Sequence, residues 1–208
     1  MATILRTWAF RHLWFYNLVS KSTSLLLGGE QRFRKLALQD LVADPEKKAL
    51  DLCCGSGLAA QVLAEEGYDL TGLDCSPVAI EMAQASVPKG KFILGRAEKL
   101  PFEADQFDLV HTSMALHEMT PAQIQKIFSE VYRVLKPGGT FTFIDFHQQD
   151  IPLIWPGLAL FLWLFETETS WQWIAQKPEV LLQKQGFVVR KKQLHAGGSL
   201  QVIQAQKL

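Results

Sequence analysis

The sequence predicts a single α/β domain in which helices cover both faces of a mostly parallel sheet. Its 208 residues, 48% of them hydrophobic, suit one domain with a full core. Between residues 47 and 146, short apolar runs alternate with segments of helical spacing, as expected of repeated strand–helix units. Residues 186–208 instead predict two alternating strands around Gly197-Gly198, and therefore an antiparallel pair at the end of the sheet.

The first strand–helix unit, residues 47–68, determines the functional prediction. An apolar run that contains Asp51 predicts a buried strand, which breaks at Gly55 and Gly57 before helical spacing resumes. A strand that turns through glycines into a helix directs backbone N–H groups and the positive end of the helix dipole at a ligand. The second strand ends in Asp74, which is well placed for a ribose. A nucleoside-shaped ligand is therefore expected at this edge.

Two ligand classes fit this geometry. Gly55-x-Gly57-x-x-Ala60, followed by an acid roughly 20 residues on, matches the dinucleotide fingerprint. The acid inside the strand favours the second class, S-adenosylmethionine (SAM). The pattern D-x-C-x-G-x-G from Asp51 resembles the first motif of class I SAM methyltransferases. In this resemblance Cys53 stands where the first glycine often falls. We therefore favour a methyltransferase over an NAD-type oxidoreductase.

The resemblance implies how the cofactor SAM is held. Asp51 would govern the methionine end, the two glycines would let the backbone approach the ligand, and Asp74 would accept from both ribose hydroxyls. Cys75 and Ala97 would flank the adenine. The residues expected to bind the cofactor are Asp51, Cys53, Gly55, Gly57, Asp74, Cys75, Arg96, Ala97, Glu98 and Ser113.

The loop after the third strand (residues 91–94) departs from the family pattern. It reads GRAEKLPF, where related methyltransferases commonly have Gly-Asp-Ala-x-x-Leu-Pro-Phe and the aspartate accepts from the adenine amino group. Arg96 occupies the aspartate position and has no acceptor. Either Glu98 supplies the adenine contact or the contact is missing. The alternative is that Arg96 only pairs with Glu98 at the surface.

The following units complete the predicted sheet. Residues 108–114 predict a fourth strand whose end, residues 111–113, faces the ligand edge. Thr120 begins a helix with one apolar face, and the KPGG at residues 136–139 is expected to end it. RVLKPGG followed by TFTFIDF, a fifth strand, is characteristic of these methyltransferases. The resemblance implies a seven-stranded Rossmann-like sheet in the order 3-2-1-4-5-7-6 with one antiparallel strand.

One domain is expected over residues 1–208, with an N-terminal helical lid segment at residues 1–35. This segment resembles the start of the ubiquinone/menaquinone methyltransferase family, which implies that Tyr16 and Asn17 belong to a lid over cofactor and substrate. An equally weighted alternative is that this segment only docks a helix on the sheet. No cleavable signal peptide is expected, because a clean apolar block is missing.

Residues 147–173 predict an aromatic insertion that serves as a substrate lid. Its uncharged part, residues 151–165, would reach only about 22 Å as a helix, short of the ~30 Å hydrocarbon core, so we reject a membrane span. Its tryptophans, Trp155 and Trp171 among them, could line an apolar acceptor pocket, pack as core or rest on a membrane surface.

Charge and cysteine usage exclude other classes. A formal net charge of zero gives no basic footprint for nucleic acid. The three cysteines have neither a disulfide framework nor zinc spacing, so no metal is expected, and they suit small buried positions in a reducing compartment. We expect a cytoplasmic protein without an obligate protein partner, with peripheral membrane contact as the alternative.

The predicted reaction is methyl transfer from SAM to a small apolar or aromatic acceptor, and C-methylation of a lipid quinone is its sharpest version. Such a reaction profits from a base. His117, just past the fourth strand, and His147, past the fifth, are candidates near the substrate, together with Tyr16 and the two tryptophans. The quinone family has an Arg-Asn pair about where this chain has Leu116-His117. A non-catalytic SAM-binding scaffold or regulator is the alternative.

Overall fold

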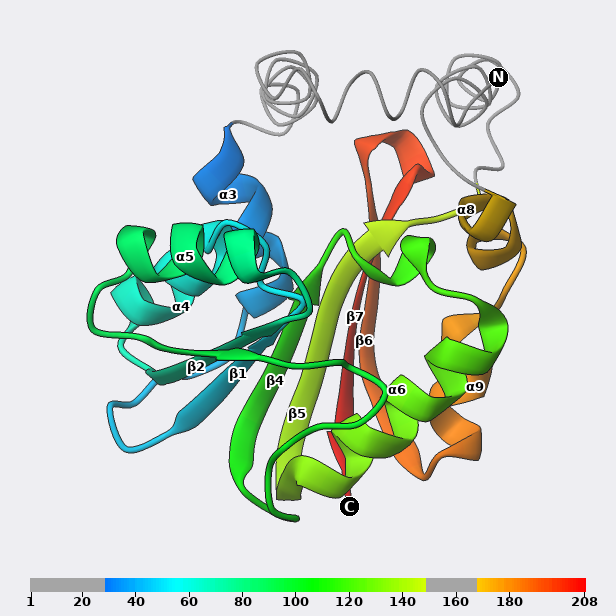
Figure 1. Ribbon diagram of the computed structural model, residues 1–208. Coiled ribbons are helices and arrows are strands. Elements are labelled where there is room, and N and C mark those ends of the chain that lie inside the picture. The colour runs from blue at the N-terminus through cyan, green and yellow to red at the C-terminus, as the bar shows by residue number, and fades with distance from the viewer. Residues whose placement is uncertain (1–28, 149–167) are drawn as a thin grey trace.

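The computed structural model describes residues 29–148 and 168–208, which form a seven-stranded sheet with helices on both sides (Figure 1). The strand order is β3-β2-β1-β4-β5-β7-β6. Strands β1 to β5 pair in parallel, whereas β7 runs antiparallel to both of its neighbours. The predicted fold class, strand order and antiparallel strand are confirmed. The strands are β1 (Lys48–Leu52), β2 (Asp69–Asp74), β3 (Lys91–Leu94), β4 (Phe107–Ser113), β5 (Leu135–Phe146), β6 (Phe187–His195) and β7 (Leu200–Lys207).

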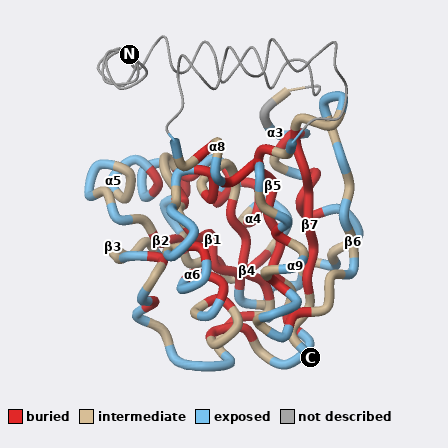
Figure 2. Tube along the Cα trace, turned by 90° about the vertical axis from the view of Figure 1, so that its right-hand side faces the viewer, coloured by how far each residue is buried: buried red, intermediate tan, exposed pale blue. Residues whose placement is uncertain are grey.

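Two groups of helices cover the sheet. On one side lie α3 (Glu30–Lys35), α4 (Leu58–Glu66) and α5 (Pro77–Ser86), and on the other α6 (Pro121–Val134), α8 (Glu168–Ile174) and α9 (Pro178–Lys184) (Figure 1). The described residues also form short 3-10 helices in the connections: η1 (Leu36–Leu38) after α3, η2 (Leu116–Glu118) between β4 and α6, and η3 (Ala196–Gly198) between β6 and β7. Buried residues concentrate on the central strands and on the helix faces against them (Figure 2).

A row of buried polar side chains crosses the sheet face beneath α3 and η1. Asp51, His111, Thr142 and Gln204 are successive register partners on β1, β4, β5 and β7, so their side chains share one face. Thr142 Oγ1 and Gln204 Nε2 both donate to the Ala37 carbonyl, at 2.7 and 3.1 Å. One end of the row therefore fixes η1 to the sheet, while Asp51 and His111 lie at the other end.

Helix α6 packs as its sequence predicts, but it ends earlier. Thr120 forms the capping box with Gln123, and the face with Ile124 and Phe128 is fully buried. The helix stops at Val134, before the KPGG expected to end it. Those residues already belong to β5, because Leu135 pairs with Phe107 and an irregularity in the register accommodates the following residues.

Several predictions concern residues outside the described ranges. Tyr16, Asn17 and Trp155 lie there, as do most of the predicted lid segments at residues 1–35 and 147–173. Within residues 29–148 and 168–208, no helix combines the length and apolar character that a membrane span requires.

Candidate active site

The loop after β1 is tied to the end of β2 through Asp74. Its Oδ2 accepts from the Gly55 N–H at 2.9 Å, and its Oδ1 accepts from the Ser76 N–H at 2.9 Å. Ser76 in turn caps α5, accepting from the Ala79 N–H at 3.3 Å. One carboxylate thus holds the glycine loop and the start of α5 together at the carboxyl edge of the sheet.

The conformation of this loop explains its residue types. Gly57, the N-cap of α4, has φ +86°, and a Cβ there would lie 2.9 Å from the Ala83 Cα. Above Gly55 the space is open, since a Cβ would meet nothing within 4 Å. Cys53 has φ +58°, a left-handed conformation that favours glycine and that a side chain adopts only at a cost. Cys53 therefore holds a backbone conformation that suits glycine, in agreement with its place in the predicted motif.

Asp51 lies directly beneath this loop and is only 1% exposed. Burial raises the pKa of its carboxyl to about 7, against the attraction of the Arg34 guanidinium and the backbone N–H of Ala60. Its Oδ2 has no hydrogen-bond partner among the described residues. A buried acceptor without a donor suits a cationic ligand. SAM carries a sulfonium and an ammonium group, so the residues present fit the predicted cofactor.

The three cysteines are free, as expected. Burial and the nearby Asp74 carboxylate raise the pKa of the Cys53 thiol, and burial with the Asp51 carboxylate raises that of Cys54. Both thiols are therefore protonated and act as small apolar groups at neutral pH. Cys75 is exposed beside Asp74, so the expectation of a buried position is wrong for this cysteine. It lies at the same edge as the other predicted cofactor residues.

The loop after β3 joins this edge through the Gly95 N–H, which donates to the Asp74 carbonyl at 2.9 Å. Arg96 is largely exposed and pairs with Glu98 at 2.8 Å, which agrees with the alternative of a surface pair. Glu98 also accepts from Gln123 Nε2 at 2.7 Å. These bonds occupy Glu98 Oε1, and Ala97 is buried between the pair. An adenine contact by Glu98 stays a prediction.

Arg34 is a residue of this edge that the sequence analysis did not single out. Its Nη1 donates to Ser113 Oγ at 2.5 Å, at the end of β4. Its charge also acts on Asp51 and His111. The only sequence signal was the basic character of the helix after Gly28-Gly29. Arg34 brings α3 into the group formed by Asp51 and Ser113.

The second part of the site lies at the ends of β4 and β5. His117 on η2 is buried, with its Nδ1 2.7 Å from Asp145 Oδ1. The other oxygen, Oδ2, accepts from the backbone N–H groups of Leu116 and His117, at 2.9 and 3.3 Å. The Phe146 ring lies 4.6 Å from the imidazole, centroid to centroid. Asp145 was missed from the sequence, although an acid within the apolar TFTFIDF run was a usable signal.

Two other predicted substrate residues, His147 and Trp171, are among the described residues. His147 follows β5, and its Nδ1 is 3.1 Å from the Gly198 carbonyl, so it joins the β6–β7 turn. Trp171 is half-buried on α8, which packs against η2. Trp173 is fully buried, donates from Nε1 to the Phe146 carbonyl at 3.0 Å and packs edge-on against Phe143. Trp173 is therefore core, one of the three roles considered for the aromatic insertion.

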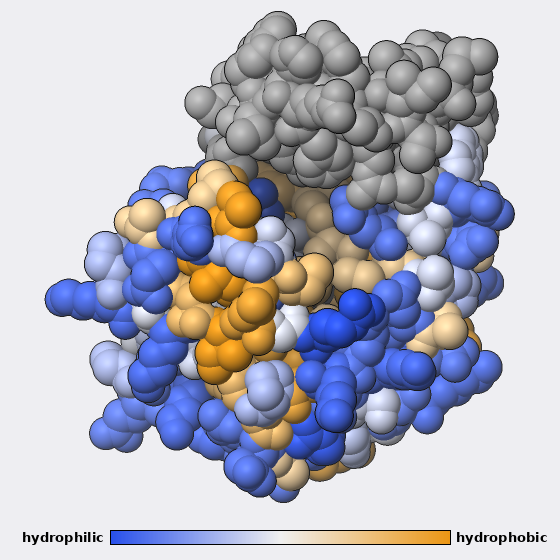
Figure 3. Space-filling model, viewed as in Figure 1, coloured by the Kyte–Doolittle hydropathy of each residue, from blue (hydrophilic) through white to orange (hydrophobic). Residues whose placement is uncertain are grey.

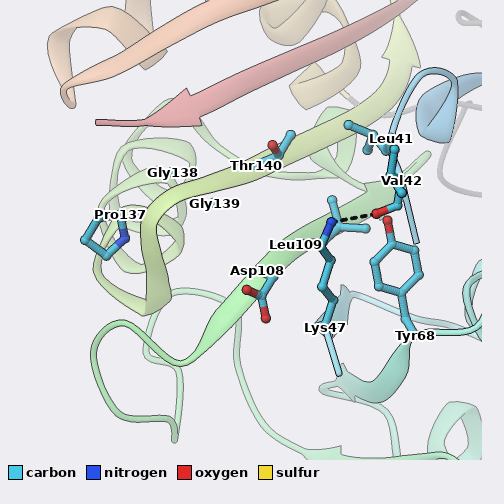
Figure 4. A pocket seen from close by; sticks show the side chains of 10 residues that line it. All are labelled: Leu41, Val42, Lys47, Tyr68, Asp108, Leu109, Pro137, Gly138, Gly139 and Thr140. Carbon is cyan, nitrogen blue, oxygen red and sulfur yellow. Dashed lines mark hydrogen bonds between the residues drawn. The ribbon is translucent and has the colours of Figure 1, made fainter. Parts of the chain in front are cut away.

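A shallow cleft of about 250 Å³ lies at the opposite, amino-terminal edge of the sheet (Figure 4). Its two charged side chains already have partners within the protein. Lys47 Nζ donates to the Val42 carbonyl at 2.8 Å, and Asp108 Oδ2 accepts from Lys136 Nζ at 2.7 Å. The unpartnered polar atoms that suit a ligand lie at the other edge, which we therefore take as the active site.

Comparisons with known proteins agree with this assignment. Residues 49–139 match the family model described as a methyltransferase domain. The chain is 54% identical to an uncharacterized methyltransferase of Synechocystis sp., over 99% of this chain and 97% of that protein. It is 30% identical to a demethylmenaquinone methyltransferase of Lactococcus lactis, over 73% and 69% of the two chains. A Beutenbergia cavernae protein of the same name is 34% identical over 59% of this chain, which spans only 50% of that relative's length.

Solved structures share the fold. A Pyrococcus horikoshii protein superimposes with a TM-score of 0.65 at 24% identity, over 85% of this chain and 91% of that one. A SAM-dependent methyltransferase of Methanosarcina mazei gives 0.63 at 24% identity, over 80% and 95%. Nothing supports the oxidoreductase or scaffold alternatives. The chain belongs to the class I SAM-dependent methyltransferases, and its cofactor is S-adenosylmethionine.

Proposed function

We propose that this methyltransferase acts on a carbon atom of a small apolar or aromatic acceptor, and that a lipid hydroquinone is the best candidate. The observation that carries the proposal is the buried His117–Asp145 pair at the ligand edge. Methylation of carbon on a hydroquinone requires a phenolate-like nucleophile, so the acceptor must lose a proton. A positioned imidazole supplies this function near neutral pH.

The geometry of the pair supports this role for His117. A carboxylate accepts hydrogen bonds only, so Asp145 Oδ1 at 2.7 Å from Nδ1 selects the tautomer with its proton on that nitrogen. Nε2 then carries the lone pair that takes the acceptor proton. SAM supplies the activated methyl group, and the protein holds donor and acceptor in line and excludes water. We propose His147 and Trp171 as further substrate contacts, because His147 follows Asp145 closely in the chain and Trp171 lies on α8, which packs against η2.

The surface beside the active-site edge suits an acceptor that dissolves in membranes. Val78 near the start of α5 and Leu94 at the end of β3 are 63% and 56% exposed, and Met82 is exposed one turn further along α5. Apolar surface gathers over this side of the molecule (Figure 3). The relatives named demethylmenaquinone methyltransferases support a quinone acceptor, although this chain spans only part of their length.

The test is a transfer assay with methyl-labelled SAM and a lipid extract reduced to the hydroquinone state. We expect one labelled methyl group in the lipid fraction, on a ring carbon, as shown by fragmentation in mass spectrometry. The variant His117→Asn should lose this product but retain binding of S-adenosylhomocysteine. Label in the aqueous fraction, or on oxygen or nitrogen, would contradict the proposed acceptor class while leaving the methyltransferase assignment intact.

A further inference from the structure

Asp51 and His111 lie side by side beneath α3. They are register partners on β1 and β4, so their side chains point to the same face of the sheet, and each is 1% exposed. Asp51 Oδ2 and both ring nitrogens of His111 have no hydrogen-bond partner among the described residues. Unpartnered polar atoms on two adjacent buried side chains are costly in free energy. A bound cationic ligand would give the Asp51 carboxylate a partner.

Several charged or polar groups surround the pair. They are Arg34 on α3, Asp74 on β2, the thiols of Cys53 and Cys54, the N–H of Ala60 on α4 and the Thr142 carbonyl on β5. Burial raises the pKa of Asp51 to about 7, and burial together with the Arg34 charge lowers that of His111 to about 3. At neutral pH the imidazole is uncharged and Asp51 is close to half-ionised.

We propose that Asp51 and His111 form a proton-linked positioning pair for the cofactor. When the ammonium group of the methionine end binds, the Asp51 carboxyl releases its proton to solvent and stays ionised. The neutral imidazole has one N–H donor, which then donates to the carboxylate. One O–H bond breaks, the proton goes to the buffer, and no other bond changes. This inference concerns cofactor binding and does not depend on the acceptor.

Isothermal titration calorimetry of the full-length protein tests the linkage. S-adenosylhomocysteine is the probe, because it keeps the ammonium group and is not consumed. Titrations in two buffers of different ionisation enthalpy give the number of protons released per ligand bound. We expect about half a proton at pH 7, approaching one at pH 6 and zero at pH 8.5. A release near zero over this whole range would overturn the proposal.

Variants at position 111 test the second partner. His111→Val suits a strand and lacks the donor, so the pH midpoint of binding should rise by about one unit, which weakens binding about fivefold at pH 7 but little at pH 8.5. His111→Asn keeps a donor and should restore most of the loss. If His111→Val does not fold, His111→Phe replaces it.

Thr112→Val is the matched control. Thr112 is equally buried, its Oγ1 also has no partner among the described residues, and it points to the opposite face of β4. Its substitution should leave the midpoint and the proton count unchanged. If His111→Val or its substitute His111→Phe keeps the wild-type pH midpoint and the wild-type proton count, His111 has only a structural role. That result would overturn its part in the pair.

Discussion

His117 Nδ1 lies 2.7 Å from Asp145 Oδ1 inside the fold, where β4 and β5 end. The second carboxylate oxygen accepts from the backbone N–H groups of Leu116 and His117. A single side chain on β5 therefore sets the position of η2, the orientation of the imidazole and the tautomer of its ring. If His117 is the base, its reactivity depends on Asp145.

Asp145→Asn should lower kcat about 10²-fold, because the amide no longer selects one imidazole tautomer, while the affinity for S-adenosylhomocysteine changes little. Steady-state rates and calorimetric titration measure the two quantities. Asp108→Asn is the control, since it removes another strand carboxylate, paired with Lys136 at the opposite edge. It should lower the melting temperature without changing kcat. An unchanged kcat in Asp145→Asn would rule out the dependence on Asp145.

Gly57→Ala should destabilise the protein by roughly 2 kcal/mol or more and weaken cofactor binding. Alanine would be strained at φ +86°, and its Cβ would lie 2.9 Å from the Ala83 Cα. This contact is relieved only if the backbone of the loop or of α5 moves. Gly138→Ala separates the two effects, because its φ is +80° but its Cβ would meet nothing within 4 Å. In urea unfolding, that control should lose about 1 kcal/mol of unfolding free energy. Equal losses in both variants would show that the contact with α5 is unimportant.

The fold was predictable because its signals are local. The glycine loop, Asp74 and the cap of α5 lie within thirty residues of each other, and strand and helix periods are read over similar windows. The start of β5 was not predictable in this way. Leu135 enters the strand because it pairs with Phe107, a contact that the KPGG pattern does not encode.

The site was predictable only in part, for the same reason. Contacts between residues far apart in the chain, such as Arg34 with Ser113 and Asp145 with His117, depend on how elements pack. His111 was expected at the ligand edge, yet its position beside Asp51 follows from the register of β1 and β4. Sequence periodicity gives the face of a strand but not the neighbour across the ladder.

Asp51 and His111 should contribute to the unfolding free energy with opposite dependences on pH. The pKa of Asp51 is raised, so its contribution to stability is present below pH 4 and is lost as the pH rises to about 7. The pKa of His111 is lowered, so its contribution is present above pH 6.5 and is lost as the pH falls towards about 3. In the wild type the two slopes largely cancel between pH 4 and 6.5.

A variant that lacks one of the two groups should show the pH dependence of the unfolding free energy that the remaining group causes. Relative to wild type, the unfolding free energy of Asp51→Asn should increase between pH 4 and 7, by up to about 4 kcal/mol. That of His111→Asn should decrease between pH 4 and 6.5, by up to about 3 kcal/mol. Urea unfolding at four pH values between 4.5 and 7.5 measures both. Parallel curves for the two variants would contradict the assigned ionisation states.

Trp171 and Trp173 lie two residues apart on α8 and should behave differently. Trp173→Ala removes a fully buried ring and its bond to the Phe146 carbonyl, so we expect a loss of about 3–5 kcal/mol in unfolding free energy. Trp171→Ala should cost much less stability, because the ring is half-buried, but should raise the KM for the acceptor if it contacts the substrate. Trp173→Phe is the control, because it keeps an aromatic ring in the core but lacks the N–H donor to the Phe146 carbonyl. A Trp171→Ala protein with unchanged KM and a large loss of stability would place Trp171 in the core instead of the acceptor pocket.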